Sequence, residues 1–352
     1  MSDPSDPAGQ PGSAGPPAPP APLPPESTPV DPELLEALGL LPPGPKPRPA
    51  REPFPWLNVA LFAGTLLTTF WFGAYGFDVP FFTDDKTHAW HLGPGLATFL
   101  AAPWTLLRGW IFSVPLMSIL LCHEMGHYVT ARLHGVRQSL PYFIPFPFVG
   151  FGTMGAVIRM DARVPDRNVL LDIGVMGPIM GMVVAVPVMI LGLHLSPVQP
   201  IAYPALLEGD SILYWALKFL IKGRIPEGWD VQLHPVALAG WIGFYLTMLN
   251  LFPIGQLDGG HVAYSTMRRP EPIYRVFNVL LIANGLALSL LGRNAMGIGF
   301  VIMGVLVFFL AGRHPPVLVP ARPLTLRRKI LGVVAAVLFV LTYVPVPWTL
   351  MD

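Results

Sequence analysis

The sequence predicts an all-α membrane protein that crosses the bilayer about seven times. Of its 352 residues, 53% are hydrophobic and only 12% are charged, and the mean hydropathy is +0.55. Charged residues make up about 25% of an ordinary soluble domain, so this composition indicates the membrane class. The formal net charge of +1 gives no sign of a nucleic-acid partner. The single cysteine, Cys122, excludes an intrachain disulfide.

The first 53 residues differ from the rest of the chain. They hold 17 prolines before residue 50, and they contain too little apolar surface to offset the entropy of ordering. We therefore expect residues 1–53 to form a disordered, proline-rich cytoplasmic tail, whose partner the sequence does not reveal. Residues 31–39 could form one short helix, either as a docking motif or as a marginal helix in a linker.

Apolar segments recur after Arg51. A spanning helix needs about 20 predominantly apolar residues. The candidate spans are 57–77, 110–133, 169–194, 236–253, 273–291, 296–312 and 330–348. Residues 96–108 predict either an interfacial helix or an extension of the second span. In this layout most of the 22 lysine and arginine residues fall on the side of the N-terminus, which favours a cytoplasmic N-terminus.

Residues 139–168 do not read as a spanning helix. Their stretch 141–155 holds three prolines and three glycines within an aromatic run. Irregular backbone at membrane depth is tolerated only when it is buried in protein or lines a wet cavity, so we expect a re-entrant loop or a short hairpin. An exposed strand edge there could bind an extended peptide, with Gly152 and Gly155 as candidate substrate-binding residues. The alternative is a membrane-surface loop anchored by phenylalanines.

Chemistry is indicated by the pattern His123-Glu124-x-x-His127 inside the second candidate span. Two histidines four residues apart on a helix lie about 40° from each other around its axis, so both imidazoles can reach one metal ion. Glu124 is then placed to act on water at that metal. Ionisable groups at membrane depth are costly and mark a functional site by default. The pattern predicts a zinc-dependent hydrolase.

A hydrolytic zinc ion usually takes three protein ligands, so a third ligand must come from elsewhere in the chain. The best candidate is Asp258, which follows an apolar span interrupted by Pro253 and Gly255. A carboxylate at such a broken helix has little reason to be there without a partner charge. His261, three residues further on, is the alternative ligand.

Two separated motifs together resemble a known family. The pairing of His123-Glu-Met-Gly-His127 with Asn250-x-x-Pro253 and Leu257-Asp258-Gly259 is similar to the site-2 protease family of intramembrane zinc metalloproteases. The intervening Gly177-Pro178-Ile-Met-Gly181 resembles another element of that family. The resemblance covers roughly residues 110–265 and implies a catalytic core of three spans.

The resemblance implies a role for each matching residue. His123, His127 and Asp258 would bind one zinc ion per chain, Glu124 would be the general base, and Asn250 would hold the substrate or the developing oxyanion. The implied activity is an endopeptidase that cuts within or near transmembrane segments of membrane proteins, as in regulated intramembrane proteolysis. A non-catalytic membrane scaffold and a metal transporter are the alternatives.

The predicted organisation has four regions. These are the tail (1–53); a first transmembrane helix with an external loop and a possible interfacial helix (54–109); the site-2 protease-like core (110–265); and C-terminal transmembrane helices (266–352). Residues 195–235 are too few for the PDZ domain that many family members carry, so we expect a PDZ-less member. We expect a multi-pass protein of the bacterial inner or plasma membrane, with its active site toward the cytoplasm.

Overall fold

The structure is a computed structural model that describes residues 54–351 except for 77–80, 84–89, 93, 148–150, 161–163, 203–204, 292–299, 303, 306–313 and 321. The predicted tail (1–53), with its possible short helix at 31–39, lies outside the described residues. Most of the candidate span 296–312 lies outside them too. The remaining predictions for the chain can be compared with the structure element by element.

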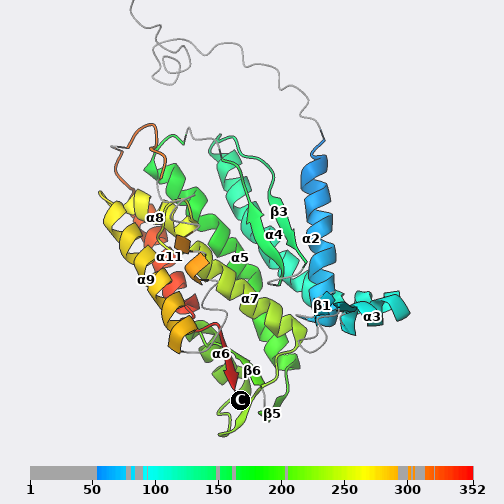
Figure 1. The fold of residues 1–352 in the computed structure, drawn as a ribbon. Helices are drawn as coiled ribbons and strands as arrows, with labels where there is room; N and C mark the ends of the chain where they lie inside the picture. The colour runs from blue at the N-terminus through cyan, green and yellow to red at the C-terminus, as the bar shows by residue number, and fades with distance from the viewer. Residues whose placement is uncertain are drawn as a thin grey trace, which may run out of the picture. The chain divides into compact units, whose positions relative to one another are not determined.

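The described residues form a mostly helical protein (Figure 1). The predicted all-α class holds only in part, because these residues also form four two-stranded sheets. Six longer helices carry the architecture, and their bounds are α2 (Trp56–Tyr75), α4 (Trp110–Leu133), α5 (Arg167–Leu195), α7 (Pro235–Asn250), α9 (Glu271–Leu291) and α11 (Leu326–Thr342). Four shorter helical segments are α3 (Pro94–Ala101), the 3₁₀ helix η1 (Pro103–Gly109), α6 (Ile212–Lys222) and α8 (Asp258–Thr266).

Four helices in the described part of the chain are long and apolar enough to cross a membrane. They are α2, η1 continued by α4, α5 and α9. α7 has only 16 residues and α11 has 17, below the roughly 20 that a straight span requires. The predicted count of seven spans is therefore not confirmed. Residues 96–108 divide between α3 and η1, and η1 leads directly into α4.

Helices α4, α5 and α7 form the centre of the bundle, with α2 and β3–β4 on one side of α4 and with α8, α9 and α11 on the far side of α5 and α7 (Figure 1). The central helices bury large apolar side chains such as Leu116, Met189 and Ile242. Burial of this kind inside a membrane protein depends on close helix packing, since the lipid outside is as apolar as the core. The centre of the bundle is therefore where polar side chains need specific partners.

The segment after α4 is a β-hairpin. β3 (Tyr142–Phe146) pairs antiparallel with β4 (Gly152–Val157), and a bulge lies between Phe143 and Pro145. The amide of Asn58 on α2 donates to the carbonyl oxygens of Leu140 and Pro141 at 3.0 Å each, and the buried Phe143 packs against α2. The hairpin alternative is thus the one observed, whereas entry of this segment into the membrane remains a prediction.

The other three sheets are also two-stranded and antiparallel. They pair β1 (Phe81–Thr83) with β2 (Trp90–Leu92), β5 (Val198–Pro200) with β7 (Trp229–Val231), and β6 (Ala205–Glu208) with β8 (Trp348–Met351). The last two sheets and α6 lie together at the end of the bundle away from α8 (Figure 1), and we call them the cap. If the N-terminus is cytoplasmic, the cap lies on the outer side.

At the opposite end, ion pairs join α11 to α5. Arg328 donates to both carboxylate oxygens of Asp172, the shortest contact being 2.6 Å, and His134 at the end of α4 lies 3.0 Å from the same carboxylate. Asp166 caps α5 by accepting from the backbone N–H groups of residues 168 and 169. These contacts hold the starts of α5 and α11 and the end of α4 in one place.

Candidate metal centre

Helix α4 supplies two histidines to one point inside the bundle. His123 and His127 lie one turn apart on its buried face, and their Nε2 atoms are 3.2 Å from each other. Neutral imidazole nitrogens are common metal ligands, and a metal ion placed beside these two Nε2 atoms could be bound by both.

The third side chain arrives through a break between two helices. Helix α7 ends at Asn250, and a series of turns leads to Asp258, the first residue of α8. A Cβ atom on Gly259 would lie 2.0 Å from the carbonyl oxygen of Leu251, and one on Gly260 would lie 2.2 Å from that of Gly255. Only glycine allows the segment to fold back so closely. The fold brings Asp258 Oδ2 to 3.2 Å from His123 Nε2 and Oδ1 to 3.3 Å from His127 Nε2.

This triangle fits a zinc ion. Ligand atoms of a tetrahedral zinc site with bonds of about 2.0 Å are about 3.3 Å apart. Each imidazole Nε2 lies at that distance from the other and from one carboxylate oxygen of Asp258, Oδ2 for His123 and Oδ1 for His127. Asp258 Oδ2 is buried and has no hydrogen-bond partner among the described residues, so a cation would satisfy it. Two imidazoles and one carboxylate are a donor set that suits zinc and leaves a fourth position open. The residues predicted as ligands therefore lie close enough to bind one metal ion.

Helix α5 orients His127 from behind. The carbonyl oxygen of Ile173 accepts a hydrogen bond from Nδ1 of His127 at 2.8 Å, which leaves the lone pair of Nε2 for the metal. A Cβ atom on Gly177 would lie 2.0 Å from His127 Nε2, and one on Gly126 would lie 2.4 Å from the carbonyl oxygen of Met176. The α4–α5 contact is therefore possible only with small residues at these positions. It packs the metal-facing imidazole directly onto the backbone of α5.

A cavity of about 420 Å³ opens onto the triangle. Glu124 is only 7% exposed and lines this cavity together with the three ligand residues. Asn250 lines it as well, and its Nδ2 atom lies 3.3 Å from His123 Nε2. A carboxylate and an amide donor thus border the same space as the metal position. This is the arrangement that hydrolysis of a carbonyl substrate requires.

The glycines predicted to bind substrate do not line this cavity. Gly152 faces α2, where a Cβ atom would lie 2.5 Å from the carbonyl oxygen of Thr68. Gly155 has a φ of 89° and open space around its Cα, and contact between either glycine and a substrate remains a prediction. Ala156, Val157 and Ile158 line the cavity instead, as do Gln138 and Met160 on either side of the hairpin. No sequence signal singles them out, because the register of the hairpin decides which of its residues face the metal.

His261 is not part of the metal triangle. It lines the cavity, but its Nδ1 atom lies 2.7 Å from Nε2 of His314, whose ring stacks on Tyr264. Nδ1 of His314 donates in turn to the carbonyl oxygen of Pro315 at 2.6 Å. His261 is therefore held by another histidine 53 residues away. Its spacing from Asp258 alone gave no sign of that partner.

Comparison with protein families adds a second line of evidence. A family model described as Peptidase family M50 matches residues 111–292, which is more than half of the chain. The chain belongs to peptidase family M50. The resemblance to site-2 proteases is thereby confirmed, and His123, His127 and Asp258 all lie inside the matched region.

Curated relatives of this M50 chain are named as zinc metalloproteases. The chain is 31% identical over 239 residues to "Probable zinc metalloprotease EGY1, chloroplastic" of Arabidopsis thaliana, a match that covers 65% of the chain and 42% of the relative. It is 27% identical over 201 residues to "Probable zinc metalloprotease EGY2, chloroplastic" of Oryza sativa subsp. japonica, covering 56% of the chain and 35% of the relative. The matches span less than half the length of these relatives.

Proposed function

We propose that this M50 chain is an intramembrane zinc endopeptidase that hydrolyses peptide bonds within or near transmembrane segments of other membrane proteins. The observation that carries the proposal is the convergence of His123, His127 and Asp258 at 3.2–3.3 Å beside the buried Glu124. The location of this site on apolar, membrane-length helices supports a substrate that is itself in the membrane.

Each residue at the site has a definite task. A bound zinc ion supplies Lewis-acid chemistry, polarising the scissile carbonyl and acidifying water. Glu124 takes the proton of the attacking water and then passes it to the leaving amine. Asn250 donates its amide N–H to the developing oxyanion. His127, held by the carbonyl oxygen of Ile173, keeps its ring in the orientation that metal binding requires.

The substrate must be extended when it is cut. A helical segment hides its peptide bonds in i→i−4 hydrogen bonds, so substrates with helix-weakening residues are expected to unwind into the cavity. Residues 156–158 border the cavity at the end of β4, and β4 pairs only with β3 among the described strands. We therefore expect the substrate backbone to lie along β4, with Gly152 and Gly155 as contacts further along that strand.

The protein is placed in the membrane by its family and its four membrane-length apolar helices. A cytoplasmic N-terminus and a bacterial inner or plasma membrane are further parts of the proposal, which rest on the charge distribution of the sequence. The relatives named above are chloroplastic proteins, so their names give no support to a bacterial membrane. The proposed partners are a transmembrane protein substrate and the lipid bilayer.

The test replaces Glu124 with Gln in the full chain, reconstituted in lipid nanodiscs with a model transmembrane substrate. Loss of the base should slow cleavage by about 10²–10⁴-fold, while zinc content stays at one ion per chain. Glu208→Gln, which removes a carboxylate of the cap, is the matched control and should leave cleavage unchanged. Undiminished cleavage by Glu124→Gln would refute the assigned mechanism, and a wild-type chain without zinc would favour a non-catalytic scaffold.

A further inference from the structure

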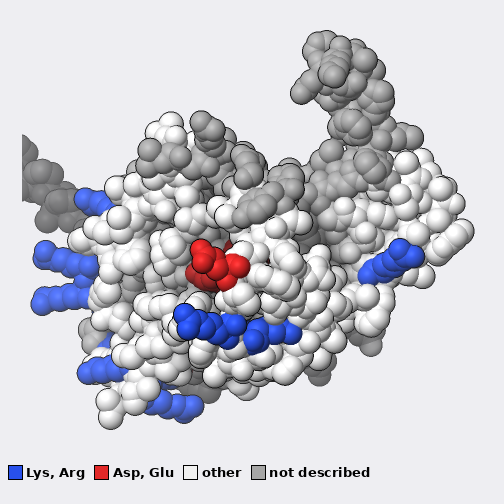
Figure 2. Space-filling view, turned by 90° about the horizontal axis from the view of Figure 1, so that it is seen from below, with Lys and Arg blue, Asp and Glu red and all other residues white. Residues whose placement is uncertain are grey.

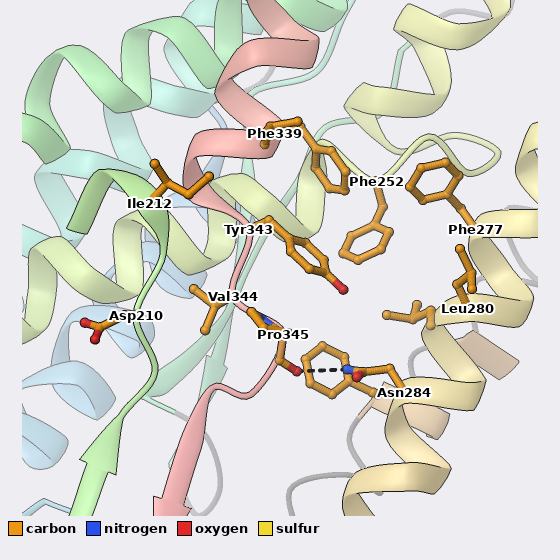
Figure 3. Close-up of a pocket in the computed structure, with 13 residues that line it drawn as sticks. Asp210, Ile212, Phe252, Phe277, Leu280, Asn284, Phe339, Tyr343, Val344 and Pro345 are labelled. Atoms are coloured by element: carbon orange, nitrogen blue, oxygen red, sulfur yellow. Dashed lines mark hydrogen bonds between the residues drawn. The ribbon is translucent and has the colours of Figure 1, made fainter. Parts of the chain in front are cut away.

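The segment that carries Asn250 and Asp258 separates two cavities. One is the metal cavity, and the other, of about 460 Å³, is lined by Phe252 of the same segment. Figure 3 shows the rings of Phe252, Phe277, Phe339 and Tyr343 around this second space. Their centroids lie 5.2–6.4 Å from that of Phe252 in edge-to-face geometry. We call this space the aromatic cavity.

The aromatic cavity opens onto surface that faces hydrocarbon. Leu280 of α9 and Val340 of α11 line it, and each is 55% exposed. Neighbouring apolar side chains on both helices are exposed as well, among them Val276, Val279, Val333 and Val337. Because α9 is long and apolar enough to span a membrane, this exposed apolar surface lies against lipid tails.

One end of the aromatic cavity lies at the level of the membrane interface. Helix α6 buries a charged side chain and exposes apolar ones, the reverse of a surface helix in a soluble protein. Lys218 is only 9% exposed, whereas Trp215, Phe219 and Leu220 are largely exposed. A helix that turns tryptophan and other apolar side chains outward lies in the interface. Ile212 of this helix lines the cavity, together with the adjacent Asp210.

Few polar groups line the cavity. Asn284 donates to the carbonyl oxygen of Pro345 at 3.0 Å, as Figure 3 shows. Asp210 also lines the cavity, but its carboxylate pairs with Lys218 and points away from Asn284. The remaining described lining residues are apolar or aromatic, apart from the hydroxyl of Tyr343. The space therefore runs from a polar end near Asn284 to an apolar interior, which is the polarity of a phospholipid.

We propose that the aromatic cavity binds one acyl chain of a membrane phospholipid, with the tail against Phe252 and the glycerol end near Asn284. An apolar space open to the bilayer meets lipid tails as its local solvent, so these are the ligand it encounters at highest concentration. A substrate helix fits poorly, because a helix about 10 Å across fills roughly 420 Å³ per turn and the cavity would hold little more than one turn.

The tail would support the segment that carries the metal ligand. Phe252 is buried, and a Cβ atom on Gly259, the residue after Asp258, would lie 2.6 Å from the Phe252 carbonyl oxygen. The backbone of Phe252 therefore packs directly on the start of α8. Filling the space behind its ring limits movement of the whole turn from Asn250 to Asp258.

The experiment uses the full chain carrying Glu124→Gln in nanodiscs that contain phosphatidylcholine with a photoactivatable diazirine near the end of one acyl chain. After illumination, peptide mass spectrometry should place adducts on Phe252, Phe277 or Phe339. Leu280→Trp should lower that labelling by roughly tenfold, because the indole occupies the volume that the tail needs. Val279→Trp is the matched control: Val279 is 63% exposed on the same helix but does not line the cavity.

A second variant with its own control tests the same prediction in case Leu280→Trp does not fold. Val340→Trp, from the α11 wall, should lower labelling as Leu280→Trp does, and Val337→Trp should not. Adducts confined to outward-facing residues such as Val276, or labelling of Phe252 that neither cavity variant reduces, would overturn the proposal. The readout needs no proteolysis, so its failure leaves the proposed activity untouched.

Discussion

Two clusters of ionisable side chains, one in the cap and one in the bundle, are neutralised in different ways. In the cap, three carboxylates (Glu208, Asp210 and Asp230) lie around Lys218 and Tyr214. In the bundle, the carboxylate of Asp258 meets two imidazoles. Both clusters contain ionisable groups that would be costly without partners, yet only one of them has the properties of a ligand site.

The cap cluster supplies its own partners. Lys218 Nζ lies 3.0 Å from Asp210 Oδ1 and 3.5 Å from Asp230 Oδ1, and Tyr214 donates to Glu208 at 2.5 Å. Figure 2 views the molecule from the end that carries the cap. Acidic side chains gather near the middle of this end, with Lys and Arg side chains close by. A fixed cation is built into the sequence of α6, so these carboxylates need no bound ion.

In the bundle cluster, one carboxylate oxygen has no hydrogen-bond partner among the described residues. Asp258 Oδ2 accepts no hydrogen bond from the described residues, and the described residues place no lysine or arginine within ion-pair distance of it. The two imidazoles and the carboxylate instead converge at the spacing of metal ligands. The comparison shows that an unsatisfied buried acceptor at ligand spacing, rather than acidity itself, distinguishes a metal site from a structural cluster.

The largest effect that would test this comparison comes from Gly177→Ala. The added Cβ atom would lie 2.0 Å from His127 Nε2 and would displace the imidazole, so zinc affinity should fall by at least about 100-fold and cleavage with it. Gly181→Ala is the control, because its Cβ atom would lie 3.2 Å from His123, and it should cost much less. Zinc titration of both variants measures the difference, and equal zinc affinities would contradict the packing argument.

The next effect, on kcat with zinc binding intact, separates Asn250 from an asparagine elsewhere in the membrane region. Asn250→Ala should lower kcat by about 10²–10³-fold with zinc content unchanged, because one oxyanion donor is lost. Asn284→Ala removes an amide that bonds to Pro345 in the aromatic cavity, and it should leave kcat unchanged. Single-turnover cleavage of the model substrate distinguishes them. If both variants are equally slow, Asn250 acts on folding and not on the oxyanion.

The smallest effect concerns the pH dependence of the cap. Burial raises the pKa of Glu208 to about 7. The hydrogen bond that Tyr214 donates stabilises the carboxylate and opposes this rise, but its effect on the pKa is smaller. The folded chain therefore holds this proton up to a higher pH than the unfolded chain, whose glutamate titrates near 4.5. The contribution of Glu208 to stability is greatest below pH 4.5 and is lost as the pH rises through 7.

Thermal unfolding in nanodiscs at several pH values measures this contribution. Glu208→Gln should flatten the decline between pH 4.5 and 7 relative to wild type, while Glu227→Gln, an exposed glutamate of the cap, should not. Zinc content should be unaffected by either change, since the cap carries no ligand in the described triangle. A wild-type profile that Glu208→Gln leaves unaltered would show that Glu208 titrates normally.

Much of the candidate site was readable in the sequence because its spacing is local. Helical periodicity alone places His123 and His127 on one face, and the structure brings them and Asp258 together. The bounds of α4 coincide with the predicted span 110–133, because its flanks are marked by polar residues and glycine. The family was also correctly inferred from two short motifs.

Other features depend on contacts between distant segments and could not be read in this way. The partner of His261 is His314, and the wall of the metal cavity comes from residues 156–158 of a hairpin whose register no local pattern specifies. The count of seven spans is not confirmed, because α7 and α11 have 16 and 17 residues, fewer than the roughly 20 that a straight span needs. Most of the candidate span 296–312 lies outside the described residues.

The sequence by itself determined the chemistry: two imidazoles one helical turn apart, a glutamate beside the first, and a carboxylate after a broken helix. Tertiary structure decided which groups surround that chemistry, namely the Ile173 carbonyl and the glycine surface of α5 behind His127, and the aromatic cavity behind Phe252. The physical reason is that ligand identity is written in residue types at short spacing, whereas orientation, access and support arise from close packing of segments far apart in the chain.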